Sequence, residues 1–176
     1  MIEKERALRD TLSSLGSVVV AYSGGVDSAY LAWVAHTTLG ERAVAITADS
    51  PSYPDRQRRM ALDVAAQCGF AHEIIHTREL ERSEYRQNPE NRCYFCKTEL
   101  YSRLTVLLPE LDVRVIVNGA NLDDRGDHRP GMLAASEHLV RSPLIEAELC
   151  KSDVRALAQH WNLPIWDKPA MPCLSS

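Results

Sequence analysis

Residues 17–28, SVVVAYSGGVDS, constrain the fold most, because an apolar run passes directly into two glycines and then into a helical pattern. A continuous apolar run of this kind is typical of a parallel strand that is buried on both faces. Glycines let the backbone turn tightly and approach a ligand. The helix expected over 28–39 would present free N–H groups and the positive end of its dipole to an anion. The segment therefore predicts a phosphate-binding loop between a strand and a helix.

The rest of the chain repeats the alternation of strand and helix. Further strands are expected over residues 43–48, 73–76 and 113–118, and further helices over 55–68, 94–108 and 151–161. Strands that alternate with helices form right-handed βαβ units and a parallel sheet. We therefore predict one α/β domain over residues 1–176, built on an open parallel sheet flanked by helices in a Rossmann-like arrangement. Residues 161–176 are expected to form a loop-rich tail.

The composition excludes several classes of protein. The 176 residues carry a net charge of −4, whereas a nucleic-acid-binding face needs clustered Lys and Arg, so we expect no nucleic-acid partner. No apolar run reaches the length of a membrane span, and the charged start MIEKERALRD does not resemble a secretory signal. We therefore expect a cytoplasmic protein with no membrane contact. In a reducing compartment the five cysteines should not form structural disulfides, which leaves ligand or catalytic roles open.

The glycine loop resembles the SGGxDS loop of the ATP-pyrophosphatase (PP-loop) superfamily, and it lacks the lysine of a Walker A loop. A plain glycine-rich turn with Ser and Asp as helix caps is the alternative. An acid beside a phosphate site indicates a cation, so Asp27 predicts Mg²⁺. The resemblance implies ATP, cleaved between its α- and β-phosphates. The nucleotide contacts that it implies are Ser23, Gly24, Gly25, Asp27 and Ser28 in the loop, and Ala48, Asp49, Ser50 and Gly119 after other strands.

A second block, residues 117–137 (VNGANLDDRGDHRPGMLAASE), resembles the LarE family, as do residues 100–104 (LYSRL), residues 151–170 and the ending CLSS. The resemblance implies an ATP-dependent sulfur transferase in the biosynthesis of the nickel-pincer cofactor. Members adenylate a carboxylate of pyridinium-3,5-biscarboxylic acid mononucleotide and convert it to a thiocarboxylate. The resemblance also implies a homo-oligomer. Family members continue into a C-terminal domain, which we expect to be missing from this chain.

The same resemblance makes Cys173 the catalytic cysteine. Its thiolate would attack the acyl-adenylate and expel AMP, and thiolates are strong nucleophiles at neutral pH. In the sacrificial type of enzyme, the C–S bond of this cysteine then breaks and leaves dehydroalanine. The alternative is that Cys173 has no catalytic role and is only a small residue in a loop bounded by prolines.

A second pair of cysteines lies in RCYFCK, residues 92–97. Cys93 and Cys96 could be a redox pair, zinc ligands or core residues, and these alternatives stay open. We favour a [4Fe–4S] cluster held by Cys93, Cys96 and Cys173, whose open iron would bind a hydrosulfide as the sulfur donor. A sacrificial Cys173 is the rival source of sulfur.

Three further residues are predicted to contact the small-molecule mononucleotide. Arg129 and Arg92 suit bidentate contacts to phosphate or carboxylate, and Asp124 belongs to the acidic cluster of the second block. For each of them, a solvated surface residue is the default alternative. Other functions also stay open: a tRNA thiolase of the same superfamily, an amide-forming ligase similar to NAD or GMP synthase, and a nucleotide-binding module without catalysis.

Overall fold

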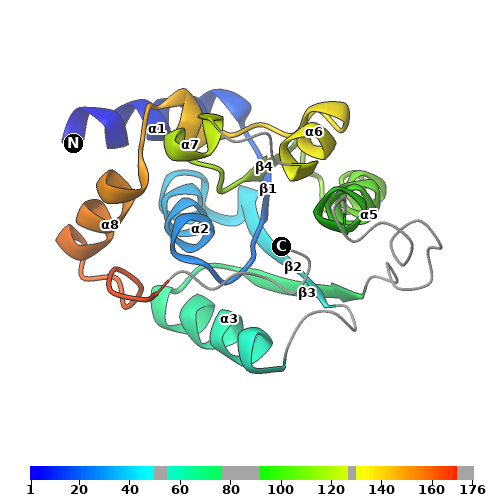
Figure 1. Ribbon diagram of the computed structural model, residues 1–176, viewed down its shortest axis with the longest axis horizontal. Helices are drawn as coiled ribbons and strands as arrows, with labels where there is room; N and C mark the ends of the chain where they lie inside the picture. The colour runs from blue at the N-terminus through cyan, green and yellow to red at the C-terminus, as the bar shows by residue number, and fades with distance from the viewer. Residues whose placement is uncertain (50–54, 77–91, 127–129, 170–176) are drawn as a thin grey trace.

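The computed structural model describes residues 1–49, 55–76, 92–126 and 130–169. Within these residues one four-stranded sheet has the order β3-β2-β1-β4, and each neighbouring pair is parallel. The strands are β1 (Val18–Ala21), β2 (Ala43–Asp49), β3 (His72–His76) and β4 (Val115–Asn118). The predicted open parallel sheet is therefore confirmed, and each strand lies within two residues of its predicted bounds (Figure 1).

Helices connect and cover these strands. They are α1 (Ile2–Leu15), α2 (Val26–Leu39), α3 (Asp55–Cys68), α5 (Arg92–Leu107), α6 (Pro130–Glu137), α7 (Pro143–Glu146) and α8 (Lys151–His160), with 3₁₀ turns η1 (Gly40–Arg42) and η4 (Leu122–Gly126). The sequence does not predict α6, because residues 117–137 have the polar composition of a loop. No helix in the described part of the chain is both long and apolar enough to cross a membrane.

The side chains of β1 divide the core into two layers. Val18 and Val20 point into the larger cluster, which joins the sheet to α1, α2, α3 and α8. Val19 and Ala21 point to the opposite face, where α5 and α6 cover the sheet (Figure 1). All four residues are buried, as expected for a strand covered on both faces. Because β1 is held on both faces, its position determines where the loop that follows it leaves the core.

Helix α8 begins at Lys151, as expected, but its N-cap is not the residue that the sequence pattern favours. The sequence pattern favours Ser152 as the N-cap, whereas Cys150 is the N-cap and its N–H donates to the Asp153 carboxylate at 3.2 Å. Lys4 of α1 donates to the same carboxylate at 2.7 Å. Hydrogen bonds from Lys4 and Cys150 lower the pKa of Asp153 to about 2. The N-terminus of α8 is therefore tied to α1.

A buried carboxylate joins α1, α2 and the end of α8. Glu5 is 6% exposed, and its Oε1 accepts hydrogen bonds from Arg9 Nε at 2.9 Å and Nη2 at 2.8 Å. Its Oε2 accepts from Trp161 Nε1 at 2.8 Å and from Tyr30 Oη at 3.2 Å. Trp161 also packs against Trp33 of α2, with ring centroids 5.5 Å apart, so it joins the end of α8 to the other helices.

We expect Glu5→Ala to lower the free energy of unfolding by about 3 kcal/mol, because it leaves buried donors and the Arg9 charge without their acceptor. Urea unfolding followed by fluorescence measures this loss. Glu3→Ala, at an exposed position of the same first turn, is the control and should change the value by less than about 0.5 kcal/mol. Equal effects of the two variants would contradict a structural role for the Glu5 carboxylate.

Candidate functional site

A cleft of about 280 Å³ opens at the carboxyl ends of β1 and β4. In the strand order β3-β2-β1-β4, the chain leaves β1 toward β2 on one side, while β4 lies on the other. Such a switch point is where open α/β sheets bind ligands. The predicted site residues that line this cleft are Ser23, Gly25, Asp27, Ser28, Cys93, Gly119 and Asp124. Residues from three distant parts of the sequence thus share one cavity.

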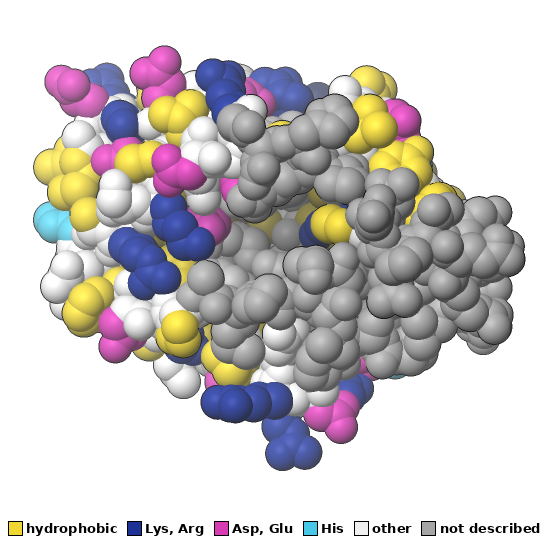
Figure 2. Space-filling view, in the orientation of Figure 1, with side chains coloured by type: hydrophobic (Ala, Val, Ile, Leu, Met, Phe, Trp, Pro, Cys, Tyr) yellow, Lys and Arg dark blue, Asp and Glu magenta, His cyan; other side chains and the backbone are white. Residues whose placement is uncertain are grey.

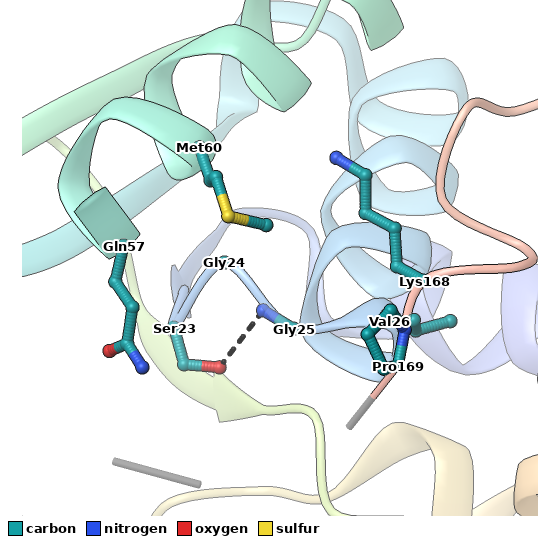
Figure 3. A pocket seen from close by; sticks show the side chains of 8 residues that line it. All are labelled: Ser23, Gly24, Gly25, Val26, Gln57, Met60, Lys168 and Pro169. Atoms are coloured by element: carbon teal, nitrogen blue, oxygen red, sulfur yellow. Dashed lines mark hydrogen bonds between the residues drawn. The ribbon is translucent and has the colours of Figure 1, made fainter. Parts of the chain in front are cut away.

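The loop after β1 is held in shape by its own serines. Ser28 Oγ accepts a hydrogen bond from Ser23 N at 3.3 Å, donates to Gly25 O at 3.2 Å and lies 3.1 Å from Ser23 Oγ. Gly25 N donates to Ser23 Oγ at 3.4 Å (Figure 3). Gly24 has φ +80°, a conformation that favours glycine. Because the N-cap residue Gly25 has no side chain, the first turn of α2 keeps N–H groups available to an anion.

Gly119 lies directly against the start of α2. A β-carbon at this position would be 2.7 Å from Ser28 N and 2.8 Å from Ser28 Cα. The missing side chain of Gly119 allows the chain at the end of β4 to touch the helix. This contact fixes one wall of the cleft against the phosphate loop.

Two carboxylates face the same cleft. Asp27 Oδ1 is buried, and it has no hydrogen-bond partner within the described residues. Burial raises the pKa of Asp27, the negative charge of Asp124 adds to this rise, and the positive charges of Lys151 and Arg155 oppose it. Asp124 Oδ2 accepts a hydrogen bond from Asn121 N at 3.0 Å. A buried carboxylate oxygen without a partner beside a second carboxylate suits Mg²⁺, which is bound by one or two carboxylates and substrate phosphates.

Helix α5 brings sulfur to the cleft. Cys93 and Lys97 both line it, and Cys96 lies one turn from Cys93 on the same helix. Cys93 and Cys96 are half-buried. A β-carbon at Gly131 would lie 3.1 Å from Cys93 Sγ, so this glycine of α6 lets the two helices pack closely at the cysteine. The sequence analysis missed Lys97, although its spacing of four residues from Cys93 places both on one helix face.

Two thiols on one helix face fit part of an iron–sulfur ligand set. In the described residues, no group of three or more His, Cys, Asp and Glu side chains is arranged to hold a metal ion. Cys173, the predicted third ligand, lies outside the described residues, as do Ser50 and Arg129. Arg92 is the first residue of α5, and the structure does not describe its side chain.

Two of the predicted nucleotide contacts, Ala48 and Asp49, lie at the end of β2 and are not among the residues that line the cleft. Ala48 packs against the second core cluster. The Asp49 carboxylate accepts a hydrogen bond from Arg58 Nη1 at 2.9 Å and lies 3.5 Å from His76 Nδ1. Their role in binding adenine stays a prediction.

A smaller cavity, of about 30 Å³, lies beside the same glycine loop. Gln57 and Met60 of α3 line it, together with Lys168 and Pro169 from the segment after α8 (Figure 3). The sequence analysis did not select these four residues, because no local motif marks them. On this side the loop therefore has neighbours from two other parts of the chain, α3 and the segment after α8.

The strand, glycine loop, helix and acidic pair together define an ATP-pyrophosphatase type of nucleotide-binding domain. A family model described as NAD synthase matches residues 2–108, which run from α1 through α5, and the chain belongs to this family. The resemblance to LarE proteins, seen in the sequence, is also confirmed. The chain is 33% identical, over 98% of its length, to pyridinium-3,5-bisthiocarboxylic acid mononucleotide synthase of Lactiplantibacillus plantarum, a LarE protein.

Two other known proteins are similar to the chain, one in sequence and one in fold. An uncharacterized protein of Synechocystis sp. is 48% identical over 96% of the chain. The chain spans 63% of the length of each of these two relatives, the one from Synechocystis and the one from L. plantarum. The solved structure of the U34-tRNA thiolase NcsA of Methanococcus maripaludis with its [4Fe-4S] cluster superposes with a TM-score of 0.70 at 22% identity, covering 99% of the chain and 67% of the thiolase. This likeness supports the fold.

Proposed function

We propose that the chain is the nucleotide-binding and sulfur-transferring part of an ATP-dependent sulfur transferase. It adenylates a carboxylate of pyridinium-3,5-biscarboxylic acid mononucleotide and converts it to a thiocarboxylate, a step in the biosynthesis of the nickel-pincer cofactor. The L. plantarum relative, which bears the name of a synthase for the bisthiocarboxylic acid product, supports this substrate class. ATP is the cosubstrate of the proposed reaction.

The single observation that carries the proposal is the shared cleft. The phosphate loop, with Ser23 and Gly25, and the thiol of Cys93 line one cavity of about 280 Å³. An adenylating enzyme that forms an amide or an ester needs the loop and has no use for a cysteine at this place. An enzyme that adenylates a carboxylate and then delivers sulfur to it needs both within reach of one substrate.

The chemistry follows from this placement. A carboxylate oxygen of the substrate attacks the α-phosphorus of ATP, the bond to the β-phosphate breaks, and pyrophosphate leaves. The N–H groups at the start of α2 and the hydroxyls of Ser23 and Ser28 hold the pyrophosphate oxygens. Asp27 and Asp124 would hold Mg²⁺, which when bound neutralises charge on the departing phosphates. A sulfur nucleophile then attacks the acyl carbon of the adenylate, and AMP leaves.

Two sources of this sulfur are compatible with the residues. Cys93, Cys96 and Cys173 would hold a [4Fe–4S] cluster, which when bound supplies sulfide carried on its open iron. Cys173 alone could instead give up its own sulfur, and the pair on α5 would then be incidental. The cluster named for the tRNA thiolase of similar fold favours the first source. Measurement of the iron content of the protein distinguishes these two sources of sulfur.

A tRNA thiolase and an amide-forming ligase are the rival functions. The match to NAD synthase over residues 2–108 covers the loop that every member shares, so it does not separate the two chemistries. In Figure 2, acidic and basic side chains are interspersed over the described part of this face, rather than gathered into a basic surface. Together with the net charge of −4, this mixture disfavours an RNA substrate.

The test uses the full chain, purified without oxygen and incubated with ATP, Mg²⁺ and the biscarboxylate mononucleotide. We expect AMP, pyrophosphate and the thiocarboxylate, detected by mass spectrometry, and about four iron atoms per chain for the type of cluster proposed. Cys93→Ala should lose the iron and multiple turnover. Cys173→Ala should form no thiocarboxylate under either source of sulfur.

Cys68→Ala is the matched control, because Cys68 ends α3 and packs against the core. It should keep iron, adenylation and product. A wild-type protein without iron whose Cys173 becomes dehydroalanine after one turnover would select the sacrificial source. An amide product from added ammonia, with Cys93→Ala and Cys173→Ala fully active, would contradict sulfur transfer and select the ligase.

A further inference from the structure

One side of α5 carries three different functional groups to the larger cleft. Cys93, Lys97 and Tyr101 follow one another at intervals of four residues, which places them on the same side of the helix, and all three line the cleft. Cys93 belongs to the sulfur-transfer chemistry proposed above, and Lys97 brings a positive charge. The hydroxyl of Tyr101 has no part in the reaction as proposed so far.

The Tyr101 hydroxyl lies against the side chain of Asn118, the last residue of β4. Asn118 Nδ2 is 3.5 Å from Tyr101 Oη, and both residues line the cleft. Tyr101 is 1% exposed and Asn118 is 8% exposed. Because a buried hydroxyl costs free energy unless it is hydrogen-bonded, the hydrogen of this phenol needs an acceptor.

The orientation of the Asn118 amide decides where that hydrogen can go. Asn118 Oδ1 accepts hydrogen bonds from Ala120 N at 3.1 Å and from Ser142 Oγ at 2.9 Å. A backbone N–H can only donate, so the oxygen of the amide faces Ala120 and its NH2 group faces Tyr101. An amide NH2 group donates and does not accept. The phenol oxygen of Tyr101 is therefore the acceptor, and its own hydrogen is directed to another partner.

The cleft offers a place for that partner. Within the part of the chain that the structure describes, Tyr101 Oη makes no hydrogen bond besides the one from Asn118. Asp27 and Asp124 line the same cleft, but they are the proposed ligands of Mg²⁺. A carboxylate on the substrate accepts through both of its oxygens and has no hydrogen to donate, so it suits a hydroxyl donor that shares a cleft with the ammonium group of Lys97.

We propose that Tyr101 is a binding residue for the mononucleotide substrate: its hydroxyl accepts from Asn118 and donates a hydrogen bond to a carboxylate oxygen of the substrate. The inference rests on the proposed function, because it takes the biscarboxylate mononucleotide as the ligand. Asn118 is a positioning residue in this arrangement. The two hydrogen bonds to its oxygen keep its NH2 group turned toward the phenol, and the phenol hydrogen is left for the substrate.

Tyr101→Phe tests the proposal, because it removes the hydroxyl and keeps the ring. We expect the dissociation constant of the mononucleotide, measured by calorimetry, and its KM in AMP formation to rise about 10- to 100-fold, the range for a hydrogen bond to a charged group. The KM for ATP and the kcat of AMP formation should stay within about twofold of the wild type, since the lost bond serves substrate binding alone. The urea midpoint should stay close to that of the wild type.

Two other tyrosines provide matched controls, because their hydroxyls have acceptors and neither residue is among those that line the cleft. Tyr94, also on α5, donates to Glu137 Oε2 at 2.6 Å. Tyr30 donates to the buried Glu5 Oε2 at 3.2 Å. Tyr94→Phe and Tyr30→Phe should both keep the wild-type affinity for the mononucleotide, and Tyr30→Phe should unfold at a lower urea concentration.

The outcomes separate this inference from the proposed function. If the wild type binds the mononucleotide and Tyr101→Phe binds it equally well, the role of the hydroxyl is refuted and the proposed function stands. A rise in the KM for ATP alone, or an equal rise for both ligands together with a loss of stability like that of Tyr30→Phe, would also overturn the inference. A wild type that neither binds the mononucleotide nor forms AMP with it would defeat the proposed function itself, and this inference with it.

Discussion

A Gly119→Ala variant is expected to form AMP about 100-fold more slowly than the wild type, because a displacement near the reacting groups is costly. The new methyl group would meet Ser28 N at 2.7 Å and Ser28 Cα at 2.8 Å. Both are backbone atoms, so no side-chain rotation relieves the clash. Either β4 moves away from α2, or the first turn of α2 shifts and its N–H groups no longer converge on the pyrophosphate.

The measurements for Gly119→Ala are the affinity for MgATP, the rate of AMP formation and urea unfolding. Overpacking should also lower the free energy of unfolding by about 1–3 kcal/mol. Gly16→Ala is the control, because a β-carbon at Gly16 meets nothing within 4 Å and Gly16, the C-cap of α1, lies before β1, whereas the loop follows β1. Gly16→Ala should lose stability through its φ of +79° yet keep its affinity for ATP. Wild-type affinity in Gly119→Ala would show that the contact at Ser28 does not shape the nucleotide site.

The glycine loop was predictable because its signals are local. The apolar run before Ser23, the glycines and the helix pattern after Asp27 are consecutive in the chain, and each has a physical meaning independent of the rest. The parallel sheet was predictable for a similar reason, since strands alternate with helices. Strand ends shifted by at most two residues, because the last residues of a strand differ little in composition from the turns that follow.

Other parts of the site depend on contacts between distant residues, which the sequence does not display. Lys97 carries no sequence motif, and its place at the site follows only from the packing of α5 over the carboxyl ends of β1 and β4. The hydroxyl of Tyr101 meets Asn118 only because α5 packs against the end of β4. Cys150 was overlooked as the cap of α8 because serine, present at 152, is the far more common cap residue. Such roles follow from topology rather than from local pattern.

The two sides of the glycine loop divide the chemistry of the site. On one side, the larger cleft carries Asp27, Asp124 and Cys93. On the other side, the small cavity is lined by Met60 of α3 and by Lys168 and Pro169 from the segment after α8. The loop, held by its serines, thus lies between two groups of residues that come from different parts of the chain. A change in the shape of the loop should therefore affect residues on both sides of it.

Asp27→Asn is expected to lower the rate of AMP formation by about 100- to 1,000-fold while leaving the fold as stable as before or more stable. The carboxylate has a buried oxygen with no hydrogen-bond partner among the described residues, and Asp124 repels it. Asparagine keeps the shape of the side chain and removes its buried charge. The free energy of unfolding of the variant should therefore equal that of the wild type or exceed it by up to about 1 kcal/mol. The loss of rate arises because a neutral amide binds Mg²⁺ poorly, and a metal that neutralises phosphate charge contributes several kcal/mol, a factor of about 100 or more.

Magnesium titrations of AMP formation and urea unfolding of Asp27→Asn separate these two effects. The midpoint of the titration should move to higher Mg²⁺, and the unfolding midpoint should not fall. Asp63→Asn, at an exposed position of α3, should leave both measurements unchanged. A buried carboxylate oxygen without a partner costs stability, and the proposed binding of Mg²⁺ would give the charge of Asp27 a function. Full activity of Asp27→Asn at low Mg²⁺ would contradict the assignment of Asp27 as a ligand of Mg²⁺.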